Sequence, residues 1–299
     1  MKRHLLKLCA FCSLFLLTFT LSAQDLPRVS TRATTTQRVG LTKVRIEYGR
    51  PSVRGRKGNI WGELVPYDQL WRTGANEATI FSVTEEVTLN GNKLLAGRYA
   101  LFTIPRKKRA WDIILTTDTT SWGTESFNSE NIVLRFQAEE EKGCSDFLET
   151  MTFTLNDVTE TSAEVRLRWE KVCVTFKLET DTRQQAIRNI EEAIAESVYG
   201  EWKVYVRAAE FYTENLAPYD AKAREQALDW INTALKFEKE HFRIHWVKAE
   251  LLALGKDYAG AIDYGRRALR FGIEEEGEDF EYRGQLERLI SIWDTKQKG

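Results

Sequence analysis

The chain has 299 residues, of which 42% are hydrophobic and 29% charged, and its formal net charge is −1. This length allows two domains of ordinary size, and the composition is that of a folded protein rather than a disordered one. Three of the 43 basic residues and none of the 44 acidic residues lie in the first 23 positions, which leaves 40 basic against 44 acidic side chains. That balance excludes the broad basic surface on which nucleic-acid binding depends.

The N-terminus has the order of residues that is typical of a cleavable signal peptide. Basic residues come first, residues 14–21 form an apolar run, and small residues precede Gln24. The apolar run is too short to span a membrane comfortably, and no later segment is apolar enough to cross one. We therefore expect residues 1–23 to be removed and residues 24–33 to form a linker. The mature protein should then be periplasmic or secreted, with no membrane span.

Residues 34–180 carry the pattern of a β-rich domain. Hydrophobic and charged residues alternate strictly between Lys43 and Tyr48, which predicts a half-buried strand. Asn90-Gly91 follows another hydrophobic run and is a strong signal for a hairpin turn. Several short strands with turn residues between them predict an antiparallel β-sandwich or a jelly-roll-like domain.

Residues 181–299 have helical spacing and an internal repeat. Residues 227–228 (Ala-Leu) recur 34 positions later as residues 261–262 (Ala-Ile), and residues 234–235 (Ala-Leu) recur as residues 268–269. Helix pairs of that length are typical of the tetratricopeptide repeat, although a plain bundle of helical hairpins fits the same pattern. A tetratricopeptide-like array implies a protein partner that docks on a concave helical face.

Two cysteines, Cys144 and Cys173, remain after the predicted cleavage. Export to an oxidising compartment permits a disulfide between them. Two unpaired thiols are the alternative, because the sequence does not show whether the two Cβ atoms meet. The sequence is compatible with both a disulfide and two free thiols.

Histidine is too scarce for many kinds of catalytic or metal site. It occurs only at His4, His241 and His245, so the β-rich domain contains none and cannot hold a Ser-His-Asp arrangement or a histidine-based zinc site. His241 and His245 lie four positions apart and could bind a metal from one face of a helix. We interpret them as packing or solvated residues, because no acidic residue or cysteine follows at a spacing that is typical of a metal site. No nucleotide-binding glycine motif is present. We expect no catalytic residue, no metal and no cofactor.

Residues 50–79 combine arginines with tryptophans and resemble neither a strand nor a disordered tail. Arginine guanidinium groups present several N–H donors in a plane, and beside aromatic rings they are suited to bind a small polar or saccharide ligand. The residues that we expect to bind such a ligand are Arg50, Arg56, Trp71, Arg72, Asn76 and Glu77. The alternative is a long loop whose arginines and tryptophans satisfy and pack its own backbone.

An enzyme acting on glycan or cell-wall material is the second hypothesis for the function. Without histidine in the β-rich domain, such an enzyme would need a pair of carboxylates. Glu63, Asp68 and Glu77 are the acids within the arginine-rich stretch. We prefer a non-catalytic binding protein, in which the helical repeat docks a protein partner and the β-rich domain holds the small ligand.

Three groups of residues resemble one known family. Residues 50–56 (Arg-Pro-Ser-Val-Arg-Gly-Arg), 71–79 (Trp-Arg-Thr-Gly-Ala-Asn-Glu-Ala-Thr) and 95–105 occur in the order found in exported bacterial proteins that are catalogued as domain of unknown function twenty-nine eleven. The resemblance covers residues 34–178. It implies a secreted β-domain, in some members followed by helical repeats, and it implies no particular activity.

Overall fold

The computed structural model describes residues 27–141, 144 and 146–299, and it divides into two compact units. One unit ends at Thr182 and is called the β-domain below, and the other, Arg183–Gly299, is called the helical domain. The predicted signal peptide and the first three residues of the predicted linker lie outside the described residues. Each domain is described by itself.

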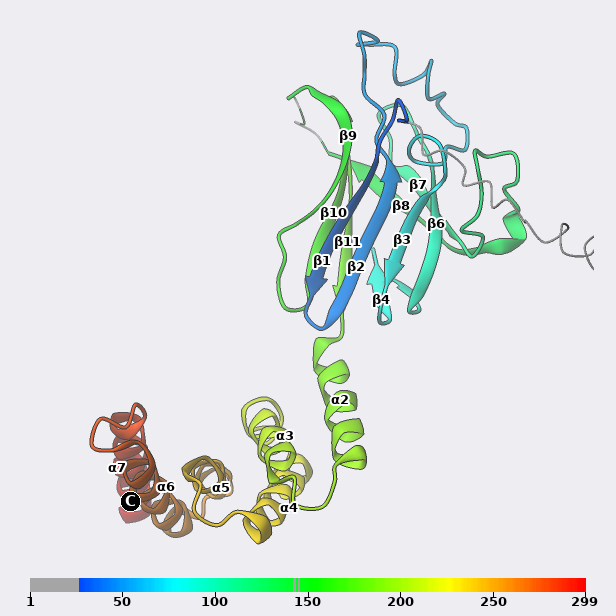
Figure 1. Cartoon of the computed structure of the whole chain (residues 1–299). Helices are drawn as coiled ribbons and strands as arrows, with labels where there is room; N and C mark the ends of the chain where they lie inside the picture. Colours follow the sequence, from blue (N-terminus) through cyan, green and yellow to red (C-terminus); the bar gives the residue numbers. More distant parts are fainter. Residues whose placement is uncertain (1–26, 142–143, 145) are drawn as a thin grey trace, which may run out of the picture. The chain divides into compact units, whose positions relative to one another are not determined.

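The β-domain consists of strands that pair antiparallel throughout (Figure 1). Their bounds are β1 (Arg32–Val39), β2 (Thr42–Gly49), β3 (Thr79–Val83), β4 (Val87–Leu89), β5 (Asn92–Leu94), β6 (Gly97–Ile104), β7 (Trp111–Thr116), β8 (Ile132–Glu140), β9 (Leu148–Asn156), β10 (Ser162–Glu170) and β11 (Val172–Thr180). Within the described residues they form an 11-stranded sheet with the main path β1-β2-β3-β6-β7-β8-β11-β10-β9. The hairpin of β4 and β5 is attached to β11. A 3-10 turn, η1 (Ser129–Asn131), precedes β8.

The local patterns that predicted strands are confirmed. In β2, Val44, Ile46 and Tyr48 are buried, whereas Lys43 and Arg45 are exposed. This alternation places the apolar residues in the core and the charged residues on the outer face of the sheet. The predicted hairpin turn joins β4 to β5, and both of its residues adopt positive φ, 44° and 81°. Two such residues are what a tight two-residue hairpin requires.

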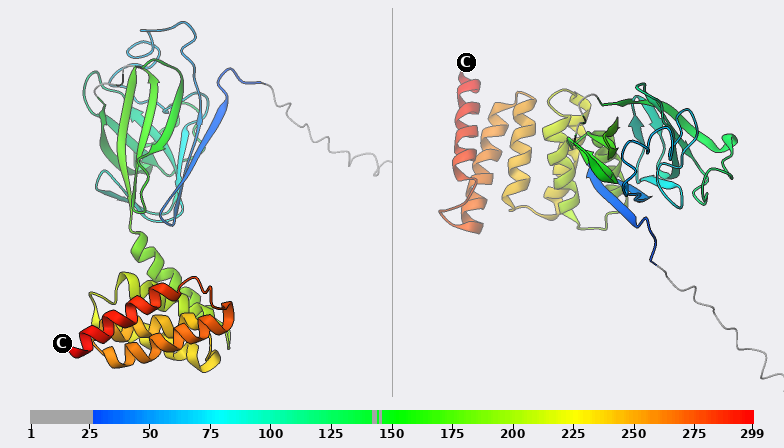
Figure 2. Two further views of the ribbon diagram at one scale, coloured as in Figure 1. Left: turned by 90° about the vertical axis from the view of Figure 1, so that its left-hand side faces the viewer. Right: turned by 90° about the horizontal axis from the view of Figure 1, so that it is seen from above.

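The sheet curves until its edge strands β1 and β9 approach each other (Figure 2). The Thr35 hydroxyl donates to the Phe153 carbonyl at 2.9 Å, and the Phe153 N–H donates to the Tyr48 hydroxyl at 3.0 Å. Beyond β2, the Met151 N–H donates to the Pro51 carbonyl at 2.9 Å. The β-domain is therefore a nearly closed, barrel-like antiparallel sheet. The more specific assignment to a sandwich or jelly roll stays a prediction.

Four tryptophans pack against one another in the core of the β-domain. The Trp61 ring lies 5.7 Å from Trp71, 5.0 Å from Trp111 and 5.6 Å from Trp169, each in an edge-to-face arrangement. Such geometry is favourable for aromatic rings, and large buried rings contribute much of a core's apolar area. Trp61 and Trp71 come from the loop before β3, so this cluster fixes the loop to the barrel.

The helical domain confirms the predicted change to helical structure. Its helices are α2 (Thr182–Glu196), α3 (Trp202–Asn215), α4 (Ala221–Phe237), α5 (Phe242–Leu254), α6 (Tyr258–Glu276) and α7 (Arg283–Lys298). Helices α6 and α7 approach closely at Gly265, where a Cβ atom would lie 2.9 Å from the Ile290 side chain. Among the described helices, none combines the length and apolar character needed to cross a membrane.

Candidate functional site

The arginine-rich stretch forms the long loop between β2 and β3. Four of its non-glycine residues adopt positive φ: Arg54 at 51°, Asp68 at 61°, Thr73 at 57° and Asn76 at 65°. Such residues are uncommon and interrupt regular pairing. This explains why residues 50–78 contain only isolated β-bridges rather than a strand.

Trp71, one of the predicted ligand-binding residues, belongs to the core. Its side chain is 8% exposed, and its ring stacks on Trp169 at 6.2 Å. Its backbone also pairs with Thr103 of β6 in both directions, at 2.8 and 2.9 Å. The ring is therefore used for packing, and little of it faces solvent.

Two predicted arginines donate to the protein's own backbone. Arg50 donates from Nε to the Met151 carbonyl at 2.9 Å and from Nη2 to the Thr152 hydroxyl at 2.8 Å, which ties the start of the loop to β9. Arg56 donates to the Val53 and Ser52 carbonyls at 2.9 and 2.8 Å. A loop outside regular structure needs such partners for its carbonyl groups. These contacts match the structural alternative for the loop.

Asn76 and Glu77 bind residues 28–32, which run up to the first residue of β1 and which we call the N-terminal segment. The Asn76 amide donates to the Ser30 carbonyl at 3.0 Å. Glu77 pairs with Arg28 at 2.6 Å and with Arg32 at 3.8 Å. The loop therefore uses these predicted ligand-binding groups on the chain itself.

Backbone contacts fix the same N-terminal segment. The Arg54 guanidinium donates to the Val29 carbonyl at 2.7 Å, and the Arg50 N–H donates to the Thr31 carbonyl at 2.8 Å. These bonds lie on either side of the Ser30 contact. Together the three contacts hold the N-terminal segment against the loop.

The ionisation of Glu77 follows from these contacts. Partial burial by itself would raise the pKa of Glu77, but the hydrogen bonds and the charges of Arg28 and Arg32 outweigh it and hold that pKa below its ordinary value. Glu77 is therefore a carboxylate at neutral pH and is unsuited to act as a general acid.

Arg72 differs from the other predicted residues. Its Nε is buried and has no hydrogen-bond partner among the described residues. Its carbonyl accepts from the Thr79 N–H at 3.2 Å, at the end of the loop. Within the part of the chain that the structure describes, the Arg72 side chain therefore lacks the protein partners that Arg50, Arg56, Asn76 and Glu77 have, and the small-ligand role of the six predicted residues stays a prediction.

Two of the three acids of the enzyme hypothesis, Asp68 and Glu77, also have arginine partners. Asp68 pairs with Arg106 at 2.5 Å and with Arg109 at 3.2 Å, whereas Glu77 pairs with Arg28. Asp68 and Glu77 thus form ion pairs with two different sets of arginines. A carboxylate-based mechanism would instead need two carboxyl groups that face one cleft.

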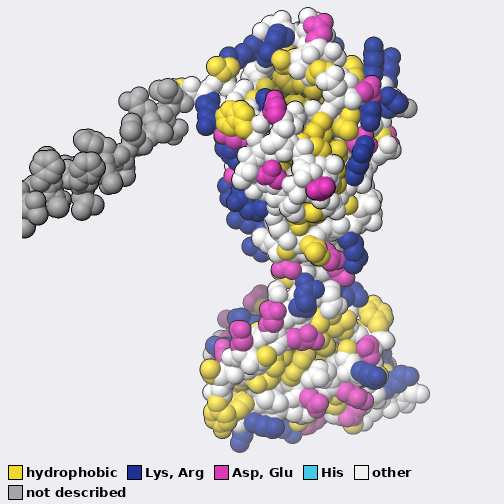
Figure 3. Space-filling view, turned by 90° about the vertical axis from the view of Figure 1, so that its right-hand side faces the viewer, with side chains coloured by type: hydrophobic (Ala, Val, Ile, Leu, Met, Phe, Trp, Pro, Cys, Tyr) yellow, Lys and Arg dark blue, Asp and Glu magenta, His cyan; other side chains and the backbone are white. Residues whose placement is uncertain are grey.

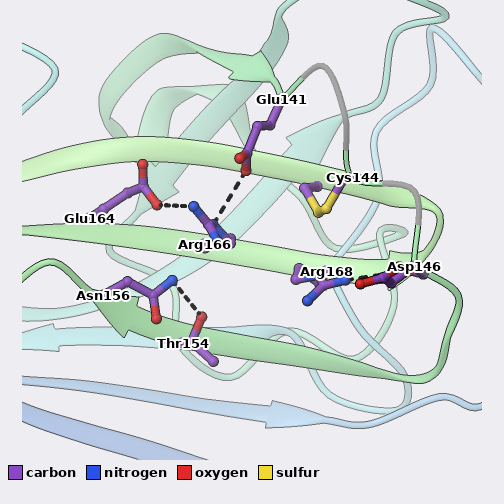
Figure 4. The surroundings of a disulfide bond; sticks show 9 residues. Glu141, Cys144, Asp146, Thr154, Asn156, Glu164, Arg166 and Arg168 are labelled. Carbon is purple, nitrogen blue, oxygen red and sulfur yellow. Dashed lines mark hydrogen bonds and ion pairs between the residues drawn. A yellow bond between two sulfur atoms is a disulfide. The ribbon is translucent and has the colours of Figure 1, made fainter.

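Cys144 and Cys173 form a disulfide in the structure (Figure 4). Their Cα atoms lie 5.9 Å apart, and the bond connects the segment between β8 and β9 to β11. Glu141 lies close to both sulfur atoms. Because the sulfurs are bonded to each other, they do not supply the two thiolates that a metal site at this position would need.

The two histidines of the helical domain have separate structural roles. His241 caps α5, where its Nδ1 accepts from the Arg243 N–H at 3.2 Å. His245 is buried, and its Nε2 lies 2.7 Å from the Lys239 carbonyl. The pair does not converge on a metal position.

A cavity in the helical domain was missed by the sequence analysis. It has a volume of about 340 Å³ and lies between α3, α5 and α7. Glu214 and Glu250 line it together with the apolar side chains of Leu254, Leu289 and Trp293. The helix spacing indicated which helices exist, but not which of their faces meet.

The fold and these sites define a protein with an antiparallel β-domain followed by a helical domain. Residues 30–178, which cover nearly all of the β-domain, match the family model described as "Protein of unknown function (DUF2911)". This match confirms the family resemblance that the motifs of the loop and of β6 predicted. No curated protein and no solved structure matches the chain.

Proposed function

We propose that this protein is an exported, non-catalytic binding protein whose helical domain docks a segment of a protein partner. The observation that carries the proposal is the cavity between α3, α5 and α7, which combines acidic and apolar lining. A cavity with a few polar groups in an apolar lining is the usual form of a binding site.

Burial at the repeated positions supports a tetratricopeptide-like organisation of this domain. Ala227 in α4 and Ala261 in α6 are 34 residues apart, and both are 0% exposed. Ala234 and Ala268 have the same separation and are also 0% exposed. Small residues at equivalent buried positions allow neighbouring helices to pack closely, as stacked helix pairs require.

The electrostatics of the cavity favour a cationic occupant. Burial, together with the nearby charges of Glu214 and Glu210, raises the pKa of Glu250 above its ordinary value, against the hydrogen bond that Glu250 accepts from the Trp246 indole at 2.9 Å. A positive group in the cavity would stabilise the ionised form of Glu250. Two cations of the chain oppose the negative charge of the cavity in part: the charge of Arg243 lowers the pKa of Glu250, and Lys296 also lines the cavity, with its ammonium 5.9 Å from the centre of the Tyr258 ring.

The partner segment is one that presents a lysine or arginine side chain. Its charged end would pair with Glu250 and Glu214, and its aliphatic stem would pack on Leu289 and Trp293. Long basic side chains bury their stems on apolar surfaces in this way. The acidic lining therefore suits a basic peptide better than an acidic one.

Titration of the full chain with Nα-acetyl-lysine amide, followed by calorimetry or NMR, tests this proposal. The matched probe is Nα-acetyl-norleucine amide, which has no ammonium group. We expect the lysine probe to bind and Glu250→Gln to weaken that binding roughly tenfold, because a charge-assisted contact is lost. Glu225→Gln, an exposed acid on α4, is the matched control. Equal binding of the two probes would refute a cation site.

We also propose that the protein is exported and that its β-domain binds a small polar or saccharide ligand. Export is supported by the sequence of the first 23 residues. N-terminal sequencing of exported material should begin near Gln24, and material that still begins at Met1 would contradict export by cleavage. We do not propose the carboxylate-based enzyme, since no specific observation favours it.

A further inference from the structure

A groove of about 490 Å³ lies on the outer face of the β-domain, over β2, β3 and β6. It is separate from the loop between β2 and β3. The charged and hydroxyl-bearing residues in its lining are Lys43, Arg45, Glu47, Ser82, Thr84 and Arg98. In the space-filling view, Lys and Arg side chains lie along both margins of the β-domain (Figure 3).

Strand register places two arginines on either side of a serine. Arg45 of β2 pairs with Ser82 of β3, and Ser82 pairs with Arg98 of β6. These three residues form one row across three neighbouring strands. Since adjacent strands are about 4.8 Å apart, the backbones of the two arginines are separated by roughly 10 Å. Their long side chains can therefore reach one small molecule from opposite sides.

The groove has more positive than negative charge. The Glu47 carboxylate is the acid that the arginines around it share: Arg45 lies at 3.2 Å, Arg98 at 3.6 Å and Arg32 at 3.7 Å. Glu47 is 14% exposed, whereas the side chains of Arg45 and Arg98 are 46% and 64% exposed. Arg32 also pairs with Glu77, but within the groove lining Glu47 faces Arg45, Arg98 and Lys43, so positive charge is in excess. Glu47 thus orients the arginines and leaves N–H donors directed to solvent.

Hydroxyl groups line the floor of the groove. The Ser82 Oγ is buried and has no hydrogen-bond partner among the described residues. The Thr84 Oγ1 accepts from the Lys43 N–H at 2.9 Å, so its own hydroxyl hydrogen is still available. A buried polar atom without a partner is uncommon and calls for an explanation. A ligand oxygen above Ser82 would supply the missing bond.

We propose that this groove binds a small oxyanion-bearing molecule, either an acidic sugar or a sugar phosphate. The oxyanion would lie between Arg45 and Arg98, and its neighbouring hydroxyls would bond to Ser82 and Thr84. Guanidinium groups match carboxylate and phosphate oxygens in geometry as well as charge. The groove is larger than a single anion needs, which favours an anion attached to a sugar-sized body. The inference rests on the proposed small-ligand role of the β-domain.

Titration of the full chain with three matched sugars tests the groove. Glucuronate carries a carboxylate, glucose 6-phosphate carries a phosphate ester, and glucose is neutral. We expect at least one of the two anions to bind and glucose not to bind. The anion that binds identifies the source of the oxyanion. Binding should weaken steeply with added salt, because the arginines are solvent-exposed.

Three variants locate the site, and a fourth controls for charge. Arg45→Gln and Arg98→Gln should each weaken anion binding roughly tenfold. Arg109→Gln, which removes an exposed arginine paired with Asp68, should leave binding unchanged. Circular dichroism and the melting temperature of each variant check that the fold is retained. Ser82→Ala, which changes no charge, should also weaken binding.

The outcomes separate this inference from the function on which it rests. If the wild-type protein binds an anion and the Arg45 and Arg98 variants bind it equally well, the groove is overturned while a small-ligand role of the β-domain stands. If neither anion binds to the wild-type protein, the groove is overturned and the small-ligand role loses its support. Binding of glucose as tight as that of glucuronate would overturn the requirement for an oxyanion.

Discussion

Arg28 and Glu77 are 49 residues apart in the sequence and form an ion pair of 2.6 Å. The pair connects the N-terminal segment to the loop before β3. With the Asn76 bond to Ser30 and the Arg54 bond to Val29, it positions the chain ahead of β1. The polar groups predicted to hold a ligand thus stabilise the start of the folded domain.

Replacing Glu77 should make a small, pH-dependent difference to stability. The pair is partly exposed, so Glu77→Gln should lower the free energy of unfolding by about 1 kcal/mol or less at neutral pH. Since folding lowers the pKa of Glu77, its contribution is present above the unfolded-state pKa and is lost as the pH falls through the folded-state pKa. Urea unfolding of both proteins at neutral and acidic pH measures this. An equal difference at both values would contradict it.

Arg50 and Arg72 should respond differently to the same substitution. Arg50→Met removes bonds to the Met151 carbonyl and the Thr152 hydroxyl, which should cost about 1.5–3 kcal/mol. Arg72→Met removes a guanidinium whose buried Nε has no partner, so its effect should be below about 1 kcal/mol. Denaturant unfolding of the two variants gives the comparison. A larger loss for Arg72→Met than for Arg50→Met would show that Arg72 is the structural arginine.

Reduction of the disulfide should destabilise the β-domain. Cys144 and Cys173 are separated by 29 residues, and closing a loop of that length stabilises a fold by roughly 3–4 kcal/mol in the chain-entropy estimate. Cys144→Ser should lower the melting temperature under oxidising conditions, and adding a reductant should not lower it further. The wild-type protein should lose the same stability when reduced. A reductant that leaves the wild-type protein unchanged would argue against the bond.

Local patterns in the sequence predicted local structure well. The alternation around Arg45 depends only on neighbouring residues, and so does the turn at Asn90 and Gly91, and the structure has both. The positive φ of Asn76 was not visible, because it follows from how the whole loop is held. Propensity and periodicity describe segments of a few residues, and the loop is fixed by contacts with distant ones.

Contacts between distant segments explain the rest of the difference. Whether Glu77 faces a ligand or Arg28 depends on where the N-terminal segment lies, which no spacing within residues 50–79 reveals. The row of Arg45, Ser82 and Arg98 likewise requires the register of three strands. A shift of one residue in any one of these strands would move its side chain to the face of the sheet opposite the other two.

Glu250 should show a pH dependence opposite to that of Glu77. Burial raises the pKa of Glu250, so the stability linked to its protonation is fully present below the unfolded-state pKa and is lost as the pH rises through the folded-state pKa. Glu250→Gln, which is neutral and can still accept from the Trp246 indole, should therefore be more stable than the wild-type protein at neutral pH, and the two should converge at acidic pH.

Thermal melts of the wild-type protein, Glu250→Gln and the control Glu225→Gln at both pH values measure this difference. A variant that is more stable but binds the lysine probe less tightly would identify Glu250 as an acid whose burial costs stability and serves binding, as expected where function and stability conflict. A Glu250→Gln protein that is less stable at neutral pH would instead show that the ionised carboxylate is well compensated by its own surroundings. The Glu250 carboxylate would then already be stabilised within the protein, and the cavity between α3, α5 and α7 would lack the uncompensated negative charge that docking of a basic side chain requires.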